Sequence, residues 1–186
     1  MDEIIREDRS LFLWLNRLGS EPFDNFWIMV SDKWIWIPLY VILLYLIYKN
    51  YSRKALFYVV IFIGLGVAAS DQISGIFKDG IARLRPCHDP LLEGVMRKVR
   101  CGGSYGFYSA HASNTFFVAM FVARMLYRRV RGMGSLLFLW AAVVSYSRIY
   151  LGVHFPLDVF FGTTVGVLLG GFFSTLALNT IRKTGA

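Results

Sequence analysis

Charged side chains are scarce in this chain of 186 residues. They make up 17% of it, whereas an ordinary soluble domain carries about 25%. Hydrophobic residues account for 56% and aromatic residues for 17%. Most of this excess lies in long apolar runs instead of scattered positions. The composition argues against an ordinary soluble domain and is typical of a chain that spans a membrane.

Other features are missing as well. The first ten residues, MDEIIREDRS, are too charged for a signal peptide, which needs a basic start and then an apolar core, so we expect no cleavage there. The chain shows no internal repeat, low-complexity stretch or flexible linker. Its length indicates one domain. We therefore predict a single membrane-embedded domain over residues 1–186.

Five apolar runs are candidates for helices that cross a bilayer, whose core of about 30 Å requires roughly 20 residues. They are residues 34–48, 55–76, 110–127, 133–146 and 155–178. The first run is short, contains Pro38, and extends backwards only across Asp32 and Lys33. We predict an all-α, polytopic helical bundle with about five transmembrane helices, and six as the alternative.

The N-terminal segment, residues 1–33, is rich in large apolar side chains. They include Leu11, Phe12, Trp14, Leu15, Phe23, Phe26 and Trp27. Aromatic-rich amphipathic helices lie in the membrane interface. We predict interfacial helices here. The alternative is that residues 10–30 pack against the rest of the protein as ordinary core.

Basic residues gather in three of the predicted connections. They are Lys49, Arg53 and Lys54, then Arg128, Arg129 and Arg131, and finally Arg182 and Lys183. With five spans these segments share one side, and because cytoplasmic loops are enriched in Lys and Arg, we predict that this side is the cytoplasm. Topology then accounts for the net charge of +8. We expect no nucleic acid partner.

Two longer segments are left on the outer side, residues 79–108 and 148–156. The only two cysteines, Cys87 and Cys101, lie in the first of them. Disulfides persist in oxidising compartments outside the cytoplasm. We therefore expect a bridge between Cys87 and Cys101, with two free thiols as the alternative.

Three polar blocks fall on this outer side. They are Lys78, six residues and Arg85-Pro86; then Tyr108-Ser109-Ala110-His111; then Ser147-Arg148, five residues, His154, three residues and Asp158. Lysine and arginine bind phosphate oxygens, and arginine does so as a bidentate fork. The second block begins a predicted helix, whose free N–H groups favour an anion. We predict a phosphate site made by Lys78, Arg85, Ser109, Ala110 and Arg148, with residues 79–108 as the extracytoplasmic active-site loop.

The third block also carries a histidine and a carboxylate four residues apart. Asp158 can accept from one nitrogen of His154 and leave the other free to attack. His111 then remains to protonate the leaving oxygen. Each feature alone has an ordinary explanation, such as a basic side chain that snorkels, a hydrogen-bonded interfacial histidine or a proline that ends a helix. Three blocks on one side of the membrane favour a site.

The remaining charged groups lead to three expectations. We expect no metal and no cofactor, because two histidines without a carboxylate cluster do not resemble a dinuclear site. We expect His88 to be solvated in its loop. Asp71 lies within a span, seven residues before Lys78, and such residues are often functional. We predict that Asp71 supports the phosphate-binding side chains, with an ordinary interhelical hydrogen bond as the alternative.

The three blocks resemble the signature of the type-2 phosphatidic acid phosphatase superfamily, the lipid phosphate phosphatases. The matched positions span residues 78–158, and the helical pattern extends the likeness over most of the chain. One departure is visible. The family usually has Pro-Ser-Gly-His where this chain has Tyr108-Ser109-Ala110-His111. Alanine keeps its backbone N–H, so we expect phosphate binding to survive in a stiffer loop.

The resemblance implies a metal-independent mechanism. His154 would attack phosphorus and form a phosphohistidine, Asp158 would orient His154, and His111 would protonate the departing group. Water would then hydrolyse the phosphoenzyme. The phosphoryl oxygens would be held through the transition state, where electrostatic stabilisation matters most, by Lys78, Arg85, Ser109 and Arg148.

The expected reaction is dephosphorylation of a lipid phosphate or diphosphate at the outer face of a bacterial inner (cell) membrane. Undecaprenyl diphosphate is the favoured substrate, and phosphatidylglycerol phosphate, phosphatidic acid and lipid A phosphates are alternatives, because the lipid-facing residues are generic. A soluble ester, as in the glucose-6-phosphatase branch, is a further alternative. A non-catalytic lipid-phosphate binding or transport protein is the alternative from another class. The sequence indicates no oligomeric state.

Overall fold

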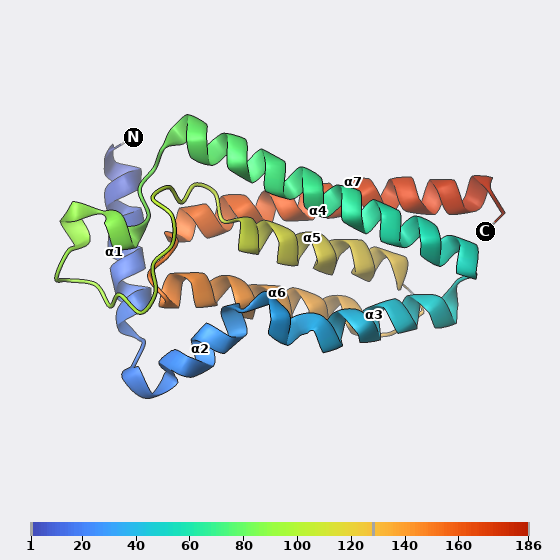
Figure 1. Cartoon of the computed structure of the whole chain (residues 1–186), viewed down its shortest axis with the longest axis horizontal. Coiled ribbons are helices and arrows are strands. Elements are labelled where there is room, and N and C mark those ends of the chain that lie inside the picture. The colour runs from blue at the N-terminus through green and yellow to red at the C-terminus, as the bar shows by residue number, and fades with distance from the viewer. Residues whose placement is uncertain (1, 128, 186) are drawn as a thin grey trace.

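The computed structural model describes residues 2–127 and 129–185, which form helices joined by loops (Figure 1). The α-helices in these ranges are α1 (Asp2–Arg17), α2 (Asp24–Ser31), α3 (Ile37–Asn50), α4 (Arg53–Ile81), α5 (Ala110–Met125), α6 (Met133–Tyr150) and α7 (Pro156–Lys183). Short 3-10 turns and one isolated β-bridge, between Leu84 and Tyr105, complete the described structure. The all-α prediction is confirmed.

Helices α3 to α7 each coincide with one of the five predicted runs. Three of them, α4, α6 and α7, are long and apolar enough to cross a membrane on their own. Residues 21–50, which contain α2 and α3, meet the same criterion as one span bent by 61°. Helix α5 has 16 residues and packs between the other helices. The chain is therefore a multi-pass membrane protein, while the count of five spans stays a prediction.

Helix α5 is the central helix of the bundle. It packs along α7 and also contacts α6 and α4. Glycines on α7 allow the two backbones to meet. A Cβ atom on Gly162 would lie 2.5 Å from the carbonyl oxygen of Ser109, and one on Gly166 would lie 2.3 Å from that of Ser113. Small residues permit such close helix packing, which places the N-terminal end of α5 directly against α7.

The two ends of the bundle carry different segments (Figure 1). Helix α1 crosses one end, where α4 finishes and α5 and α7 begin, and the long loop before α5 lies beside it. We call this the α1 end. The α3–α4 turn, the α5–α6 turn and the C-terminal end of α7 lie at the opposite end. Arg129 and Arg131 belong to this opposite end, and Arg128 lies outside the described residues. The fold thus separates the basic connections from the three polar blocks.

Helix α1 docks on the adjacent ends of α6 and α7 with one of its faces. Phe12 is buried and meets Phe155 with ring centroids 5.4 Å apart. The buried amide of Asn16 donates to the carbonyl oxygen of Tyr150 at 3.0 Å. The opposite face exposes apolar side chains such as Trp14, which is 61% exposed. One face of α1 therefore packs as protein core, while the other presents apolar surface.

Candidate active site

The three sequence blocks meet at the α1 end of the bundle. Arg85 lies in the loop after α4, His111 in the first turn of α5, and His154 just before α7. The charged and titratable groups that interact electrostatically with His111 are Arg148, His154, Lys78 and Arg85. The fold therefore gathers both predicted catalytic histidines and the three predicted phosphate-binding cations around one point.

His154 and Asp158 form the pair that their spacing predicts. Nδ1 of His154 lies 3.4 Å from Oδ2 of Asp158, and the two side chains are 2% and 0% exposed. The same oxygen accepts the backbone N–H of Phe155 at 2.9 Å. Pro156 begins α7, a position where its missing N–H costs nothing. The first turn of α7 thus holds the carboxylate beside one nitrogen of the imidazole and leaves Nε2 for other partners.

Burial determines the protonation state of this histidine. It lowers the pKa of His154 from 6.5 to about 4; Asp158 opposes the shift, and Arg148 and Arg85 add to it. The imidazole is therefore neutral at neutral pH. With its proton on Nδ1, facing the carboxylate, Nε2 keeps a lone pair. That is the state that a nucleophilic histidine requires.

Arg85 reaches this free nitrogen. Its Nη1 lies 3.4 Å from Nε2 of His154 and 3.4 Å from the carbonyl oxygen of Val153. Its Nε donates to the carbonyl oxygen of Tyr105 at 3.1 Å. Burial lowers the pKa of Arg85, and Asp158 opposes that shift, yet a guanidinium stays charged in proteins. A phosphoryl oxygen bound by Arg85 would lie in front of Nε2.

The loop around Arg85 is closed by backbone pairing. The N–H of Arg85 donates to the carbonyl oxygen of Ser104 at 3.0 Å, and the N–H of Gly106 donates to that of Arg83 at 2.8 Å. A Cβ atom on Gly106 would be in tight contact with two groups, 3.1 Å from Cγ of Arg85 and 3.2 Å from Oδ2 of Asp158. The loop backbone at Gly106 therefore lies close to both Arg85 and Asp158.

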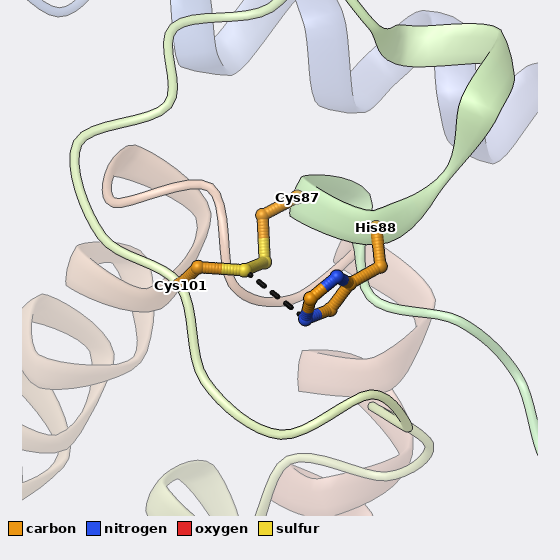
Figure 2. Close-up of side chains that lie close together, drawn as sticks. All are labelled: Cys87, His88 and Cys101. Carbon is orange, nitrogen blue, oxygen red and sulfur yellow. Dashed lines mark hydrogen bonds between the residues drawn. A yellow bond between two sulfur atoms is a disulfide. The ribbon is translucent and has the colours of Figure 1, made fainter.

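A disulfide joins the same two arms further out. Cys87 and Cys101 are bonded, with their Cα atoms 5.8 Å apart. Figure 2 shows the imidazole of His88 beside this bridge. Its Nε2 lies 3.3 Å from Sγ of Cys101 and 3.0 Å from the carbonyl oxygen of Gly102. The ring of His88 is exposed. It contacts the loop and is not part of the constellation around His154.

These loop residues also make up the one group of three potential metal ligands within residues 2–127 and 129–185. One ligand atom from each of Cys87, His88 and Cys101 lies within 4.8 Å of the others. The two sulfur atoms are bonded to each other, whereas cysteine binds metals as the thiolate. The disulfide form of the cluster therefore does not offer a metal site.

Arg148 has a buried donor without a partner among the described residues. It is in the last turn of α6 and is 9% exposed. Nη1 donates to Oγ of Ser31 at the end of α2, but Nε has no acceptor among the described residues. A buried donor without a partner costs about 1–3 kcal/mol. A phosphate oxygen would supply the missing acceptor.

Ser109 and Ala110 start α5 beside Asp158. Oγ of Ser109 accepts the N–H of Ala112 at 3.4 Å, and its N–H donates to the carbonyl oxygen of Asp158 at 3.0 Å. Ala110 is the first helical residue, without a positive φ. Alanine therefore fits where the family usually has glycine. The first N–H groups of the helix, at Ala110 and His111, have no partner within it and favour an anion.

Asp71, on α4, forms a hydrogen bond with α5. Its Oδ1 accepts from Nδ2 of Asn114 at 2.8 Å, so the interhelical hydrogen bond that the sequence left as an alternative is present. Asp71 also attracts Lys78 electrostatically. Asn114 follows His111 by three residues, which is about one helical turn. The hydrogen bond thus ties together the two helices that carry Lys78 and His111.

Sequence reasoning missed two charged residues of the site, Arg83 and Asp8. Nη1 of Arg83 donates to Oδ1 of Asp158 at 2.8 Å, and Nη2 donates to Oδ2 of Asp8 at 2.5 Å. Asp8 lies in a densely charged segment where no pattern marks one carboxylate as buried. Arg83 lies two residues before Arg85 in a stretch that is also rich in charge. Its closeness in sequence to Arg85 was the only sign that it could belong to the site.

An apolar cavity of about 470 Å³ opens beside His111, between α3, α4, α5 and α6. Its wall includes Trp36, Leu43, Ile47, Val118, Val122 and Val144. Ser31, at the end of α2, and Lys33, in the 3-10 turn before α3, line it together with His111. The cavity therefore extends from His111 into the apolar interior of the bundle.

The chain is similar to known membrane phosphatases. The model of the PAP2 superfamily matches residues 59–182. A lipid A 4′-phosphatase of Porphyromonas gingivalis is 37% identical over 92% of this chain and 73% of the relative. One of Bacteroides thetaiotaomicron is 35% identical over 89% of this chain and 72% of the relative. An undecaprenyl-diphosphatase of Sulfolobus acidocaldarius is 31% identical over 82% of this chain and 66% of the relative.

The fold is also found in a solved structure. A transmembrane PAP2-type phosphatidylglycerolphosphate phosphatase from Bacillus subtilis superimposes with a TM-score of 0.73 at 20% identity. The match covers 97% of this chain and 89% of that chain. At this identity the likeness concerns the fold alone.

Proposed function

The chain belongs to the PAP2 superfamily, and we propose that it removes a phosphate from lipid A at the outer face of a bacterial inner membrane. It is a PAP2 lipid phosphatase that hydrolyses phosphate esters. The proposal adds the substrate, the membrane face and the roles of the individual side chains. Each of these additions has its own support and its own test.

Lipid A replaces undecaprenyl diphosphate as the favoured substrate. The two lipid A 4′-phosphatases reach 37% and 35% identity over 92% and 89% of this chain. The undecaprenyl-diphosphatase reaches 31% over 82%. A phosphate monoester on the sugar of lipid A, one of the alternatives that the sequence left open, is therefore better supported than a polyprenyl diphosphate.

One observation carries the mechanism: the neutral, buried His154 has Asp158 at Nδ1 and Arg85 at Nε2, each at 3.4 Å. Nε2 attacks phosphorus while Arg85 and Arg148 bind the phosphoryl oxygens. A bond forms between Nε2 and phosphorus as the bond from phosphorus to the sugar oxygen breaks. The imidazolium that results donates Nδ1–H to Asp158, which stabilises its charge.

His111 completes the reaction. A bound phosphate next to it favours the imidazolium form, which gives its proton to the departing sugar oxygen. Neutral His111 then takes a proton from water as the water oxygen attacks the phosphohistidine. Inorganic phosphate leaves, Nε2 regains its lone pair and His111 is protonated for the next turnover. Lys78 and the N–H groups at the start of α5 stabilise the charge on the phosphoryl oxygens throughout.

The cavity beside His111 supports a lipid over a soluble ester. Its volume of about 470 Å³ and its apolar wall suit the hydrocarbon chain of a substrate whose phosphate lies at the histidines. Burial of each CH₂ group is worth about 0.8 kcal/mol. A soluble sugar phosphate would leave this apolar surface without a partner.

The outer face is supported by the distribution of charge. Arg129, Arg131, Arg182 and Lys183 lie at the end of the bundle opposite the catalytic residues. Since cytoplasmic loops are enriched in Lys and Arg, the α1 end faces away from the cytoplasm. The Cys87–Cys101 disulfide agrees with an oxidising compartment on that side.

Purified protein in detergent tests the proposal through release of inorganic phosphate. The substrates are lipid A, undecaprenyl diphosphate, phosphatidylglycerol phosphate, phosphatidic acid and glucose 6-phosphate, each with and without EDTA. We expect the highest kcat/KM with lipid A and no effect of EDTA, because cationic side chains hold the phosphate. Mass spectrometry of the product should show the loss of one phosphate from the sugar unit distal to the reducing end.

The other outcomes are equally informative. A higher kcat/KM with undecaprenyl diphosphate would contradict the substrate and restore the first expectation. Loss of activity with EDTA, restored by Mg²⁺ or Zn²⁺, would contradict the histidine mechanism. Tight binding of lipid phosphates without phosphate release would contradict turnover and favour a binding or transport protein.

A further inference from the structure

We propose that Arg83 and Asp8 are positioning residues that hold the carboxylate of Asp158 in place for His154. The inference rests on the proposed function, because it assigns Asp158 to the phosphatase reaction. Neither residue belongs to the three sequence blocks, and Asp8 lies outside residues 59–182, which the PAP2 model matches. The catalytic unit therefore extends to the N-terminal helix α1.

Three contacts orient the guanidinium of Arg83. Nη1 donates to Oδ1 of Asp158 at 2.8 Å, and Nη2 donates to Oδ2 of Asp8 at 2.5 Å. The guanidinium carbon lies 4.2 Å from the ring centroid of Phe155. The side chain of Arg83 is 18% exposed, so water competes little for these bonds. Two carboxylates and one aromatic face define the plane of the guanidinium and, through it, the position of Oδ1.

Asp8 balances the charge of Arg83 and holds the start of α7. Its side chain is 2% exposed, and its Oδ1 accepts the N–H of Leu157 at 2.9 Å. Leu157 is the second residue of α7, and N–H groups in the first turn have no partner within the helix. Asp8 thus caps α7 from another helix. The residue it caps directly precedes Asp158.

Asp158 divides its two oxygens between different partners. Oδ2 faces His154 and the N–H of Phe155, whereas Oδ1 faces Arg83. A competing cation is close, because Arg85 also interacts electrostatically with Asp158. Because Arg83 binds Oδ1, Asp158 does not need Arg85 as its counter-charge, and Arg85 stays available for the phosphate. The same bond keeps Oδ2 beside the imidazole of His154. A shift of about 1 Å at a reacting group can cost about 10²-fold in rate.

The first test compares Asp8→Asn, Arg83→Gln and the double variant in the full-length protein. Both lipid A and p-nitrophenyl phosphate serve as substrates. We expect kcat to fall by up to about 10²-fold in each single variant, because a misplacement of about 1 Å at a reacting group can cost that much. KM should change little, because the phosphate-binding side chains remain. Asp8→Asn keeps a side-chain oxygen that can accept the N–H of Leu157, so its effect on Asp158 should pass through Arg83, and the double variant should be no slower than Arg83→Gln alone.

The pH profile separates positioning from a loss of folded protein. Asp158 raises the pKa of His154 through its hydrogen bond. If Asp158 shifts away, the pKa of His154 falls, and the acid limb of kcat/KM moves to lower pH than in wild type. The other groups that face His154 are unchanged in these variants and are Arg148, Arg85 and His111. A smaller folded fraction would lower kcat/KM by the same factor at every pH and leave the pH of the acid limb unchanged.

Arg9 offers a matched control. Its Nε donates to Oδ2 of Asp89 at 2.8 Å, so this pair also ties α1 to the active-site loop, but it contacts neither Asp158 nor His154. Arg9→Gln should keep the wild-type kcat and acid limb. Equal losses in Arg9→Gln and Asp8→Asn, with unshifted profiles, would overturn the inference, because docking of α1 alone would then explain both.

Chemical rescue gives a second, independent readout. Arg83 lines a cavity of about 970 Å³ through which a small ion can enter. Guanidinium ion at millimolar concentration should restore part of the kcat of Arg83→Ala, whereas urea should not, because urea has the shape without the charge. Absence of rescue together with an unshifted acid limb would overturn the positioning role.

The two substrates keep this inference separate from the proposed function. If wild type hydrolyses p-nitrophenyl phosphate but not lipid A, the lipid assignment fails, and the comparison of variants still decides the role of Arg83. If wild type hydrolyses neither, the phosphatase mechanism fails, and the positioning role fails with it.

Discussion

Nη1 of Arg85 lies 3.4 Å from Nε2 of His154, the ring nitrogen that faces away from Asp158. A neutral imidazole is thus bracketed by a carboxylate on one side and a guanidinium on the other. In the mechanism we propose, a phosphate oxygen replaces Nε2 as the partner of Arg85. This exchange would bring phosphorus in front of the lone pair that attacks it.

The two histidines should respond differently to substitution. We expect His154→Ala to abolish both the phosphoenzyme and turnover with every substrate. His111→Ala should slow the hydrolysis of lipid A far more than that of p-nitrophenyl phosphate. The alkoxide that leaves lipid A must be protonated, whereas p-nitrophenolate leaves readily without a proton. General acid catalysis contributes about 10²–10⁴-fold, and the difference between the two substrates should be of that size.

Phosphoenzyme trapping decides between the two assignments. A phosphoenzyme in His154→Ala together with none in His111→Ala would exchange the roles. His88→Ala is the matched control, because its exposed ring contacts only the loop, and it should form the phosphoenzyme as wild type does.

The acid limb of kcat/KM should lie well below the pKa of a free histidine. The pKa of His154 is lowered to about 4, so the nucleophile is neutral above that pH and activity falls only as the pH drops through it. Asp158 raises this pKa, and Asp158→Asn should therefore move the limb to still lower pH while it reduces kcat. The ratio of variant to wild-type rates on one substrate cancels the ionisation of the phosphate. A ratio that changes around pH 6.5 instead of around pH 4 would contradict a buried, neutral nucleophile.

Loss of the disulfide should destabilise the loop that carries Arg85. In the chain-entropy model a bridge that closes a loop of about 15 residues contributes about 3 kcal/mol. We expect replacement of Cys87 and Cys101 by serine to lower the free energy of unfolding by about that amount and to raise KM. Thiol labelling of the unreduced, denatured wild type should find no free cysteine. Two labelled thiols would show that the bridge is absent in the purified protein.

Introduced cysteines should report the orientation in the membrane. Glu93 and Arg131 are both exposed and lie at opposite ends of the bundle. In intact cells, Glu93→Cys should react with membrane-impermeant reagents and Arg131→Cys only with permeant ones. The reverse pattern would put the catalytic residues in the cytoplasm and contradict hydrolysis at the outer face.

The sequence by itself predicted the helices, and it supplied the residues from which we propose the phosphate site. Apolar runs and basic connections are local properties, so they predict helices and shared ends of a bundle without knowledge of the packing. The spacing of His154 and Asp158 is likewise local, because residues four apart share one face of a helical turn. From the sequence we favoured undecaprenyl diphosphate, but the lipid-facing side chains are generic and do not distinguish it from lipid A.

Only the tertiary structure decided how the pieces support each other. The approach of α5 to α7 at Gly162 and Gly166 sets the position of Ser109 beside Asp158. Arg83 and Asp8 are 75 residues apart in the sequence, and no periodicity links a carboxylate on α1 to a loop arginine. Their pairing follows from burial, because a charge enclosed by protein must find its counter-charge in the neighbouring elements, and which elements become neighbours is settled only when the helices pack.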